Sequence, residues 1–478
     1  MRDLGREASA ARSPPRAPSF GKSKNDGYDE PMTSLDLAIV GGGISGLALA
    51  YWLRETAPER AVQVFEKAPE GGGKVRSSVQ DGFTFDWGPN GFLGSAPDTL
   101  ELVTALGLTE LLQSADERAE TRFVYRDGGL RPLPRTPGAF LRSELLSPRG
   151  KARAALEFWR GAAVGHEESV YGFVERHFGS EAAAALAELM VTGVAAGDPR
   201  RLSLDALFPR LRALEREWGS LLRGLRAGRG VAPGRLTSFT EGGVGRLSGA
   251  LAGALGGALV TGAEVLALEP LAAGYGLTLA SGETVTAKAV VLACPAFVSA
   301  DLLEPFAPEA SALLAGIPYA DVGVFGLGYD RIDVPRDLSG FGFLAPRGQG
   351  LRSLGVLFSS ATFPGQAPPG KVMLRAIAGG SLDPDFLALP DEEALEAVRR
   401  DLRLSMGITA EPEFVAYMRW PRGIPQYELG HAQRLQGLRE ALATQPGLFL
   451  SGNAYEGVAV NDCLRNARQL ARRLAAQS

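Results

Sequence analysis

The chain has 478 residues, 45% of them hydrophobic and 22% charged, which is enough for about three domain-sized units with buried cores. Fifty basic and 54 acidic residues give a formal net charge of −4, which excludes the basic balance of a nucleic-acid-binding protein. Two cysteines exclude a disulfide scaffold and indicate a reducing compartment, and three histidines without metal-type spacing predict no metal site. Because no apolar run approaches the ~18 residues of a membrane span, we predict a cytoplasmic protein with at most peripheral membrane contact.

Residues 1–33 differ from the rest of the chain. They are rich in Arg, Pro, Ser and Lys and have almost no periodic apolar residues, which predicts a disordered N-terminal extension. They lack the apolar segment of a secretory signal. Their composition also suits an organelle transit peptide, but Met32 lies just before the first predicted strand, so a loose tail or an over-long start is the preferred interpretation.

A strand, a glycine turn and a helix are predicted in direct succession between Leu35 and Leu53. The turn reads Gly41-Gly42-Gly43-Ile44-Ser45-Gly46 and matches the pattern G-x-G-x-x-G. The first glycine of this pattern permits the tight turn, the second lets a pyrophosphate approach the backbone, and the third lets the helix pack on the strand. Glu66 ends the next strand, 20 residues after Gly46 (66 − 46), where a carboxylate accepts from a ribose hydroxyl.

Two more glycine-containing turns follow within 25 residues of Glu66 (91 − 66), at Gly72-Gly73-Lys74 and at Gly88-Pro89-Asn90-Gly91. A simple NAD-binding unit does not need them. They are expected where a flavin continues past the pyrophosphate and lies against the backbone, and here the chain begins to resemble the FAD-dependent amine oxidase superfamily. The alternative is a turn beside a β-hairpin.

The middle of the chain, residues 140–230, is predicted to be helical and is rich in Ala, Leu and Arg. Nine arginines between residues 200 and 235, Arg212 among them, are interleaved with Leu, Phe and Trp218. A basic amphipathic segment of this kind lies on anionic membrane surfaces. A merely solvated arginine face explains the pattern equally well.

After the helical segment, short apolar runs return to the first sheet and then build a second one. The first group is predicted at 258–268, 277–279, 289–293 and 448–453, and the second at 322–329, 340–344 and 372–378. Helices are predicted at 96–112, 391–404 and 462–475. The order predicts an α/β fold: a discontinuous Rossmann-type FAD-binding domain, an α+β substrate domain and a helical insert.

The stretch from Gly452 to Cys463 is the most specific in the sequence. A glycine just after a core strand lets the backbone reach the pyrophosphate, and Gly457 keeps the approach open. We predict that Asn461 or Asp462 is the N-cap of the last helix, whose positive end then points at the flavin N1/C2=O edge. Such a dipole favours the reduced flavin.

Seven motifs in order resemble the oxygen-dependent protoporphyrinogen oxidase and coproporphyrinogen III oxidase family of haem biosynthesis, from Ser34 to the end of the chain. Besides the first glycine turn, Gly88 to Gly91 and Gly452 to Cys463, they are Arg122-Phe123-Val124-Tyr125, Gly193 to Gly197, Gly340-Phe341-Gly342-Phe343-Leu344, and Gly423-Ile424-Pro425-Gln426-Tyr427 with Gly430-His431.

The resemblance implies the fold of amine oxidases and p-hydroxybenzoate hydroxylase, with the cofactor and substrate sites in separate segments. It implies FAD held by Gly41 to Gly46, Glu66, Gly72, Gly73, Lys74, Gly88, Pro89, Asn90, Gly91, Val265, Gly452, Asn453, Val458, Ala459 and Val460. It implies a porphyrinogen between Phe341, Gly342, Phe343 and Leu344 on one side and Ile424 on the other, with Gly193 near the ring nitrogens. Arg122 matches the family arginine that pairs with a propionate, a match that guanidinium geometry suits.

The predicted domains follow the same resemblance. The FAD-binding domain takes residues 34–119, 236–298 and 444–478, the helical domain, a candidate for membrane contact, takes 120–215, and the substrate-binding domain takes 216–235 and 299–443. A homodimer is left open.

No residue is assigned as a catalytic acid or base. The resemblance implies that the flavin performs the redox chemistry, with its N5 as the hydride acceptor and O2 as the final oxidant, so that three rounds remove six electrons and form three H2O2. Coproporphyrinogen III is the alternative substrate. A flavin amine oxidase is a further alternative, disfavoured because Val458, Ala459 and Val460 stand where such enzymes place an aromatic residue. A flavin-free protein of the same fold, like the Rab GDP-dissociation inhibitors, is disfavoured by the intact glycines and Glu66. His431 is predicted to have a structural hydrogen-bonding role.

Overall fold

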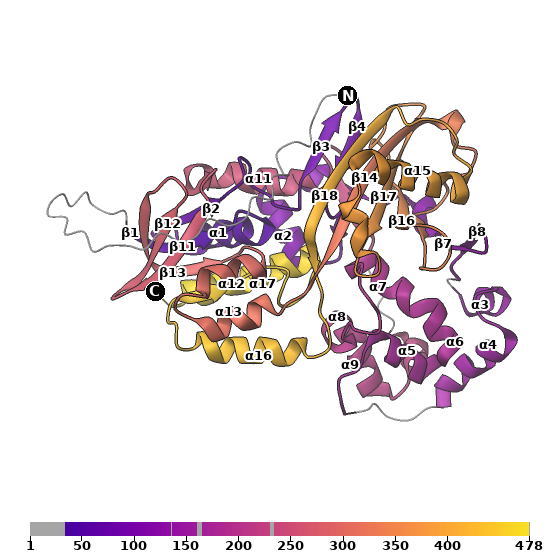
Figure 1. Ribbon diagram of the computed structural model, residues 1–478, viewed down its shortest axis with the longest axis horizontal. Coiled ribbons are helices and arrows are strands. Elements are labelled where there is room, and N and C mark those ends of the chain that lie inside the picture. Colours follow the sequence, from indigo (N-terminus) through magenta and orange to yellow (C-terminus); the bar gives the residue numbers. More distant parts are fainter. Residues whose placement is uncertain (1–33, 135, 160–164, 230–233, 478) are drawn as a thin grey trace.

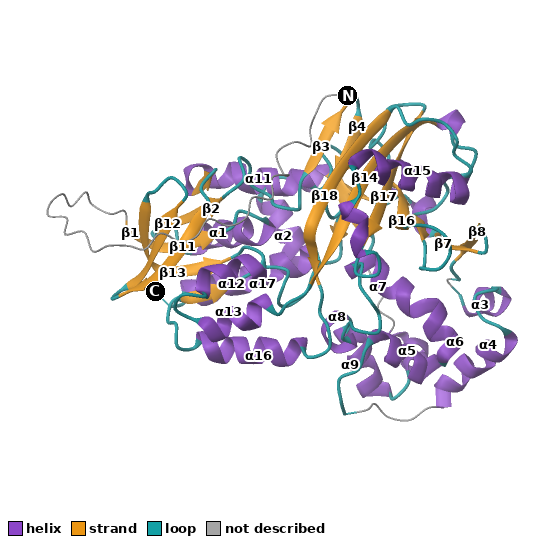
Figure 2. Ribbon diagram, in the orientation of Figure 1, coloured by secondary structure: helices purple, strands orange, loops and turns teal. Residues whose placement is uncertain are grey.

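The computed structural model describes residues 34–134, 136–159, 165–229 and 234–477, so the predicted N-terminal extension lies outside the described residues. Three bodies can be followed in Figure 1: a three-layer α/β/α unit, a second sheet with one helix on its outer face, and a group of short helices below that sheet. Figure 2 shows that strands are concentrated in the first two and that the third is helical.

The first sheet is built from segments far apart in the sequence. Strand β1 (Ser34–Val40) pairs in parallel with β2 (Val62–Glu66) on one side and with β13 (Thr284–Leu292) on the other. Both faces of β1 are buried, which is why its sequence is a nearly continuous apolar run. The remaining strands are β10 (Leu259–Thr261), β19 (Leu448–Leu450), β11 (Val265–Leu271) and β12 (Gly274–Leu279), the last two forming an antiparallel hairpin beside β13.

Helices cover both faces of the first sheet. The core on one face joins β1 to α1 (Ile44–Thr56), α2 (Pro97–Ala105), α11 (Gly245–Leu255) and α17 (Val460–Ala475). The core on the other face includes α12 (Ala296–Leu303), α13 (Pro308–Ala315) and α16 (His431–Leu442). The chain leaves this unit after α2 and returns twice. The layered, discontinuous arrangement is the Rossmann-type fold predicted from the sequence.

The predicted helix at 96–112 is shorter in the structure. Helix α2 ends at Ala105, because Gly107 adopts a positive φ of 70° that breaks the helix, and a 3-10 turn and β6 (Leu112–Ser114) follow. Strand β9 (Leu236–Phe239) lies between β6 and β5 (Phe92–Leu93) in a small sheet. Residues 236–239 therefore fasten the region after α2 to the first body.

The second sheet has seven strands and is antiparallel except at one pair. Its order is β18 (Phe414–Pro425), β14 (Tyr319–Asp330), β17 (Lys371–Gly379), β16 (Ser353–Phe358), β15 (Gly342–Leu344), β7 (Arg122–Arg126) and β8 (Gly129–Pro132). Helix α15 (Asp391–Met406) packs on the outer face through Val398 and Leu402, and the hairpin of β3 (Ser77–Gln80) and β4 (Phe83–Asp86) packs on the inner face. Strands β7 and β8 thus belong to this sheet, although the residues that form them were assigned to the helical domain by sequence.

The helical body is made of short helices around its own core. They are α3 (Pro137–Arg142), α4 (Pro148–Ala155), α5 (Val170–Phe178), α6 (Ser180–Ala182), a π-helical turn (Ala183–Ala187), α7 (Glu188–Ala195), α8 (Leu204–Leu207), α9 (Pro209–Trp218) and α10 (Leu221–Gly224). Leu214 and Leu221 pack in this core, so residues 209–224 lie with the helices and not with the second sheet. Among the described residues, the remaining α-helix is α14 (Ser359–Thr362), which follows β16.

Arginine 212 is not part of an exposed basic face. It is 3% exposed and forms ion pairs with Asp205 and with Glu215, which is itself bonded to the buried His177. Arg201 and Arg216, by contrast, are 65% and 70% exposed. The basic stretch therefore divides into internal ion pairs and surface charges. No helix in the described part of the chain is long and apolar enough to cross a membrane.

Candidate active site

The first glycine turn has the geometry of a phosphate-binding loop. A Cβ on Gly41, where φ is 109°, would lie 2.9 Å from the carbonyl of Ala293, and a Cβ on Gly46 would lie 2.0 Å from the Gly41 oxygen. At Gly43 the space is open, with nothing within 4 Å of an added Cβ. Helix α1 starts directly after Gly43 with no side-chain cap and no acidic residue in its first turn. The first N–H groups of α1 thus have no side-chain cap, and the open space beside Gly43 leaves room for an anionic group.

Glu66 closes one side of the same turn. Its Oε2 accepts from the N–H of Gly42 at 2.7 Å and its Oε1 accepts from the N–H of Ala68 at 2.8 Å. The side chain is almost fully buried. Because a carboxylate offers about four acceptor positions, these two bonds fix its orientation and leave capacity for ribose hydroxyls.

The second glycine turn lies against the first. The N–H of Gly72 donates to the Gly42 oxygen at 2.7 Å, and a Cβ on Gly73 would lie 3.1 Å from the Cα of Gly43. Lys74 then extends toward the second sheet, where its Nζ donates to the carbonyl of Gly423 on β18. Burial lowers the pKa of Lys74 to about 8.

The third turn, Gly88 to Gly91, is held by the second sheet. Arg375 of β17 donates to the carbonyls of Asp86 (3.2 Å) and Gly88. Burial lowers the pKa of Arg375 to about 10 and raises that of the buried Asp86 carboxyl. A Cβ on Gly88 would clash with the Lys74 carbonyl at 2.3 Å, so the second and third turns also touch. Sequence reasoning missed Asp86 and Arg375, because each pairs with a partner hundreds of residues away.

The C-terminal motif starts as predicted but its helix cap does not. Gly452 and Gly457 have positive φ values of 136° and 100°. Helix α17 begins at Val460 with Ala459 as N-cap and no side-chain cap, so the prediction of Asn461 or Asp462 as N-cap was wrong. The Asn461 side chain instead accepts from the N–H of Leu93 at 2.8 Å and donates to its carbonyl at 3.1 Å. Asn461 thus acts as an extra strand partner for β5.

The remaining predicted cofactor residues occupy mixed positions. Val458 is half-buried and Ala459 is exposed just before α17, whereas Val460 is buried in the core with α1. Val265 starts β11 and is buried in the same core as Phe65, the residue before Glu66.

One face of the second sheet brings together the predicted substrate residues. Arg122 stands opposite Gly342, Gly342 opposite Leu357, and Leu357 opposite Arg375. Residues paired in this way lie on the same face, so Arg122 and Leu357 face the side on which Arg375 reaches Gly88. The Arg122 guanidinium lies 4.9 Å from the ring centroid of Phe341, and no carboxylate partner is found for it among the described residues.

Helix α7 stands over this face. Leu344 packs against Leu189 of α7, and Ile424 of β18 packs against Ala196 at the end of α7. Gly193 lies on the exposed side of α7, where an added Cβ would meet nothing within 4 Å. In Figure 1, α7 lies between the second sheet and the rest of the helical body. The face of the sheet that bears Arg122, beside this helix, is therefore the candidate substrate site.

Phe343 is not brought to this site. It is 3% exposed and packs on the opposite face of the sheet, in the core with α15. Strand alternation turns neighbouring side chains to opposite faces, so Leu344 and Phe343 cannot both face the substrate. Leu357 and Ile377, half-buried on the face of Arg122, were not selected from the sequence. The alternation of side chains along each strand can be seen in the sequence. Which face they share with Arg122 depends on the order of the strands, which local sequence does not show.

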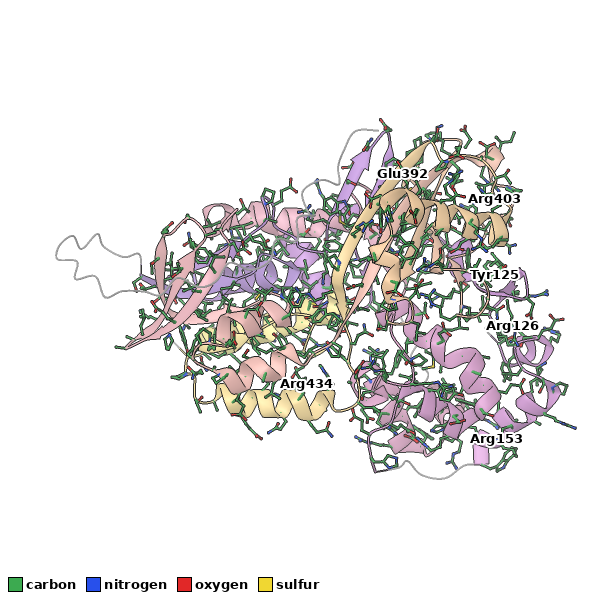
Figure 3. The ribbon with its side chains drawn as sticks, in the orientation of Figure 1. Tyr125, Arg126, Arg153, Glu392, Arg403 and Arg434 are labelled. Atoms are coloured by element: carbon green, nitrogen blue, oxygen red, sulfur yellow. The ribbon has the colours of Figure 1, made fainter. Side chains whose placement is uncertain are left out.

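A cavity of about 220 Å³ opens at the edge of the second sheet and contains none of the glycine turns. Tyr125, Arg126, Glu181, Arg347 and Gln349 are among its lining residues. Figure 3 labels Tyr125 and Arg126, which lie where β7 meets the helical body. We do not assign it to the cofactor, because the glycine turns are elsewhere. In the described part of the chain, no group of His, Cys, Asp or Glu side chains is arranged to hold a metal ion.

The comparison with known proteins identifies the family of the chain. The family described as "Flavin containing amine oxidoreductase" matches residues 44–475. The chain belongs to this family. It is 34% identical to protoporphyrinogen oxidase 1, chloroplastic, of Arabidopsis thaliana, over 95% of this chain and 90% of that one. It is 30% identical to coproporphyrinogen III oxidase of Bacillus subtilis (strain 168), over 90% and 95% of the two chains.

Solved structures support the same fold. A crystal structure from Exiguobacterium sp. 255-15, which carries the provisional name protoporphyrinogen oxidase, is 27% identical and superposes with a TM-score of 0.83 over 93% of this chain and 99% of that one. Cyclohexylamine oxidase from Brevibacterium oxydans IH-35A is 20% identical with a TM-score of 0.67, covering 93% and 99%, and shares the fold. The predicted fold class and the predicted flavin cofactor, FAD, are confirmed, and the chain is an oxidoreductase. The residues that hold FAD and substrate stay predictions.

Proposed function

We propose that this chain oxidises protoporphyrinogen IX to protoporphyrin IX, with O2 as the final electron acceptor. The observation that supports it most is the row from Arg122 through Gly342 and Leu357 to Arg375. It joins an apolar face, whose Arg122 guanidinium has no carboxylate partner among the described residues, to the turn assigned to the flavin. FAD, when bound, supplies the hydride acceptor.

The side chains of this face suit a flat, apolar macrocycle with acidic groups at its rim. Leu344, Leu357 and Ile377 offer aliphatic contact on the sheet, and Ile424 offers it at the end near α7. Arg122 stands at the outer edge of the row, where its guanidinium suits a propionate as a two-pronged donor. Aliphatic walls also keep water from the reacting carbon.

Coproporphyrinogen III is the second candidate substrate, supported by the 30% identity to the Bacillus subtilis relative. It has propionates where protoporphyrinogen has vinyl groups on two rings. The deciding experiment incubates the purified holoprotein in air with each porphyrinogen separately and follows the fluorescence of the porphyrin formed. We expect a faster reaction with protoporphyrinogen. A faster reaction with coproporphyrinogen would make coproporphyrinogen III the substrate. If neither substrate gave porphyrin, the proposed oxidase function would be rejected.

Peripheral membrane contact by the helical body belongs to the same proposal, as does a homodimer. Leu141, Leu156 and Trp159 are 66%, 55% and 74% exposed on that body, and basic side chains accompany them. Apolar side chains with a basic surround bind anionic bilayers. Sedimentation with vesicles containing anionic lipid tests the contact, and loss of sedimentation in Trp159→Ala is the expected result.

A further inference from the structure

Tyr427 touches the C-terminal motif at two points. It lies between β18 and α16 and is 1% exposed. Its hydroxyl donates to the carbonyl of Asn453 at 2.7 Å and accepts from the N–H of Gly457 at 3.0 Å. A single hydroxyl therefore closes the loop between Gly452 and the residues that precede α17.

His431 adds a third attachment from the same side. Its ring stacks on that of Tyr427, with centroids 4.1 Å apart and an interplanar angle of 13°. Its Nε2 lies 3.1 Å from the carbonyl of Tyr455, and because a carbonyl only accepts, this nitrogen carries the proton. The stacked pair thus holds backbone groups of three alternate residues, Asn453, Tyr455 and Gly457.

The same segment is tied to the helical body on its other side. The carbonyl of Tyr427 accepts from the N–H of Ser203 at 2.8 Å, just before α8. The neighbouring Gln426 donates from Nε2 to the carbonyl of Ala195, the last residue of α7, at 2.9 Å. Tyr427 therefore sits on a backbone segment that is itself held by the helix over the candidate substrate site.

We propose that Tyr427 is a positioning residue for FAD, which holds the loop from 452 to 457 so that the start of α17 faces the cofactor. This rests on the C-terminal motif being part of the FAD site of the proposed oxidase. The Tyr427 hydroxyl bonds backbone groups of the loop, so we assign it a role that acts through the loop. Burial raises the pKa of its hydroxyl far above the ordinary value, so the group stays protonated and remains a donor at every working pH.

The test is Tyr427→Phe in the holoprotein, measured as the rate at which FAD fluorescence appears on release into buffer. The ring and its stacking on His431 remain, and only the hydroxyl is removed. We expect FAD release about tenfold faster, because the Gly457 N–H and the Asn453 carbonyl lose their partner. The bound-flavin circular dichroism is expected to change as well, a signal that a loss of global stability alone would not alter before unfolding.

Tyr275→Phe is the matched control. Tyr275 is 2% exposed in the first body, and its hydroxyl donates to the carbonyl of Pro446 at 3.0 Å, a residue outside the glycine turns. It loses the same chemical group, so its FAD release is expected to stay within about twofold of the unchanged protein. Equal release in the two variants, or no change in Tyr427→Phe, would overturn the inference.

If Tyr427→Phe does not fold, His431→Phe decides the matter, since it removes only the bond to Tyr455 and keeps the stack. Faster release of FAD in that variant supports the proposal, and the unchanged rate rejects it. If the unchanged protein holds FAD and forms porphyrin, and both variants release FAD at the unchanged rate, the role of Tyr427 is rejected and the proposed function stands. If the unchanged protein is purified without FAD, or forms no porphyrin, the proposed function is rejected instead.

Discussion

The buried guanidinium of Arg375 donates a hydrogen bond to the backbone carbonyl of Gly88. Arg375 belongs to the second sheet and Gly88 to a turn of the first body, so one side chain joins the candidate substrate face to the candidate flavin site. The candidate substrate face and the candidate flavin site are therefore connected directly by this hydrogen bond.

Arg375→Met should weaken both the fold and cofactor retention. The change removes the guanidinium that donates to the carbonyls of Asp86 and Gly88, and with it a positive charge that acts on the buried Asp86 carboxyl. We expect the free energy of unfolding to fall by about 2 kcal/mol, because these backbone carbonyls lose a buried charged donor, with loss of FAD on gel filtration. Arg118→Met, at a side chain that is 78% exposed, is the control in urea unfolding. Equal stability of the two variants would contradict the role of Arg375.

Substitutions at two glycines of the first turn are expected to have different effects. An added side chain at Gly43 meets no protein atom within 4 Å, whereas one at Gly46 would lie 2.0 Å from the Gly41 oxygen. Gly43→Val is therefore expected to fold and to purify without yellow colour, because it fills the place assigned to the pyrophosphate. Gly46→Val is expected to be insoluble or strongly destabilised. Absorbance of bound flavin and circular dichroism distinguish the two, and a yellow Gly43→Val protein would contradict the cofactor assignment.

Arg122→Ala should raise the Michaelis constant for porphyrinogen about tenfold or more, since a charge-assisted bond to a propionate is worth ~1.5–3 kcal/mol. FAD content should not change, because Arg122 lies at the far end of the row from Gly88. Arg122→Lys should recover part of the effect, as a lysine keeps the charge without the planar fork. Steady-state kinetics with Arg118→Ala as control test this. An unchanged Michaelis constant in Arg122→Ala would remove the residue from the site.

The lowered pKa of Lys74 predicts that the stability of the flavin-free protein depends on pH. The pKa of Lys74 falls from an ordinary 10.5 to about 8 on folding, so between these values the unfolded chain binds more protons than the folded one. The contribution of Lys74 to stability therefore increases as pH rises from about 8 to about 10.5. Lys74→Met lacks this contribution, and its stability advantage over the unchanged protein should shrink across that window in urea unfolding at two pH values. Parallel behaviour of the two proteins would show that Lys74 is not held in a poorly solvated place.

Local pattern was sufficient for the first body. The apolar run of β1, the glycines at 41, 43 and 46, and Glu66 at the end of β2 are close in sequence, and the structure joins them by short contacts such as that of Gly42 with Glu66. The fold class and flavin cofactor could be predicted for the same reason. In the motif from 452 onward, Gly452 and Gly457 have positive φ values, which suits the glycines found there.

Side-chain direction in the second sheet was not available from the sequence. The position of Phe343 depends on which face of β15 meets α15, and Arg375 gains its meaning from a turn 287 residues away. Asn461 is a residue type that often caps helices, but its side chain bonds the backbone of Leu93, 368 residues away. The local preference for a cap is therefore overridden by a strand that is distant in sequence. The membership of β7 in that sheet likewise depends on its pairing with β15.

The most direct test of the central claim is to mix the yellow holoprotein with protoporphyrinogen in the absence of oxygen and to record flavin absorbance and porphyrin fluorescence together. We predict that the flavin colour bleaches as fluorescence rises, and that admitting air restores the colour and lets the reaction continue with formation of H2O2. A flavin that stays oxidised with both protoporphyrinogen and coproporphyrinogen, yet bleaches with a simple amine, would contradict the assignment and identify an amine oxidase.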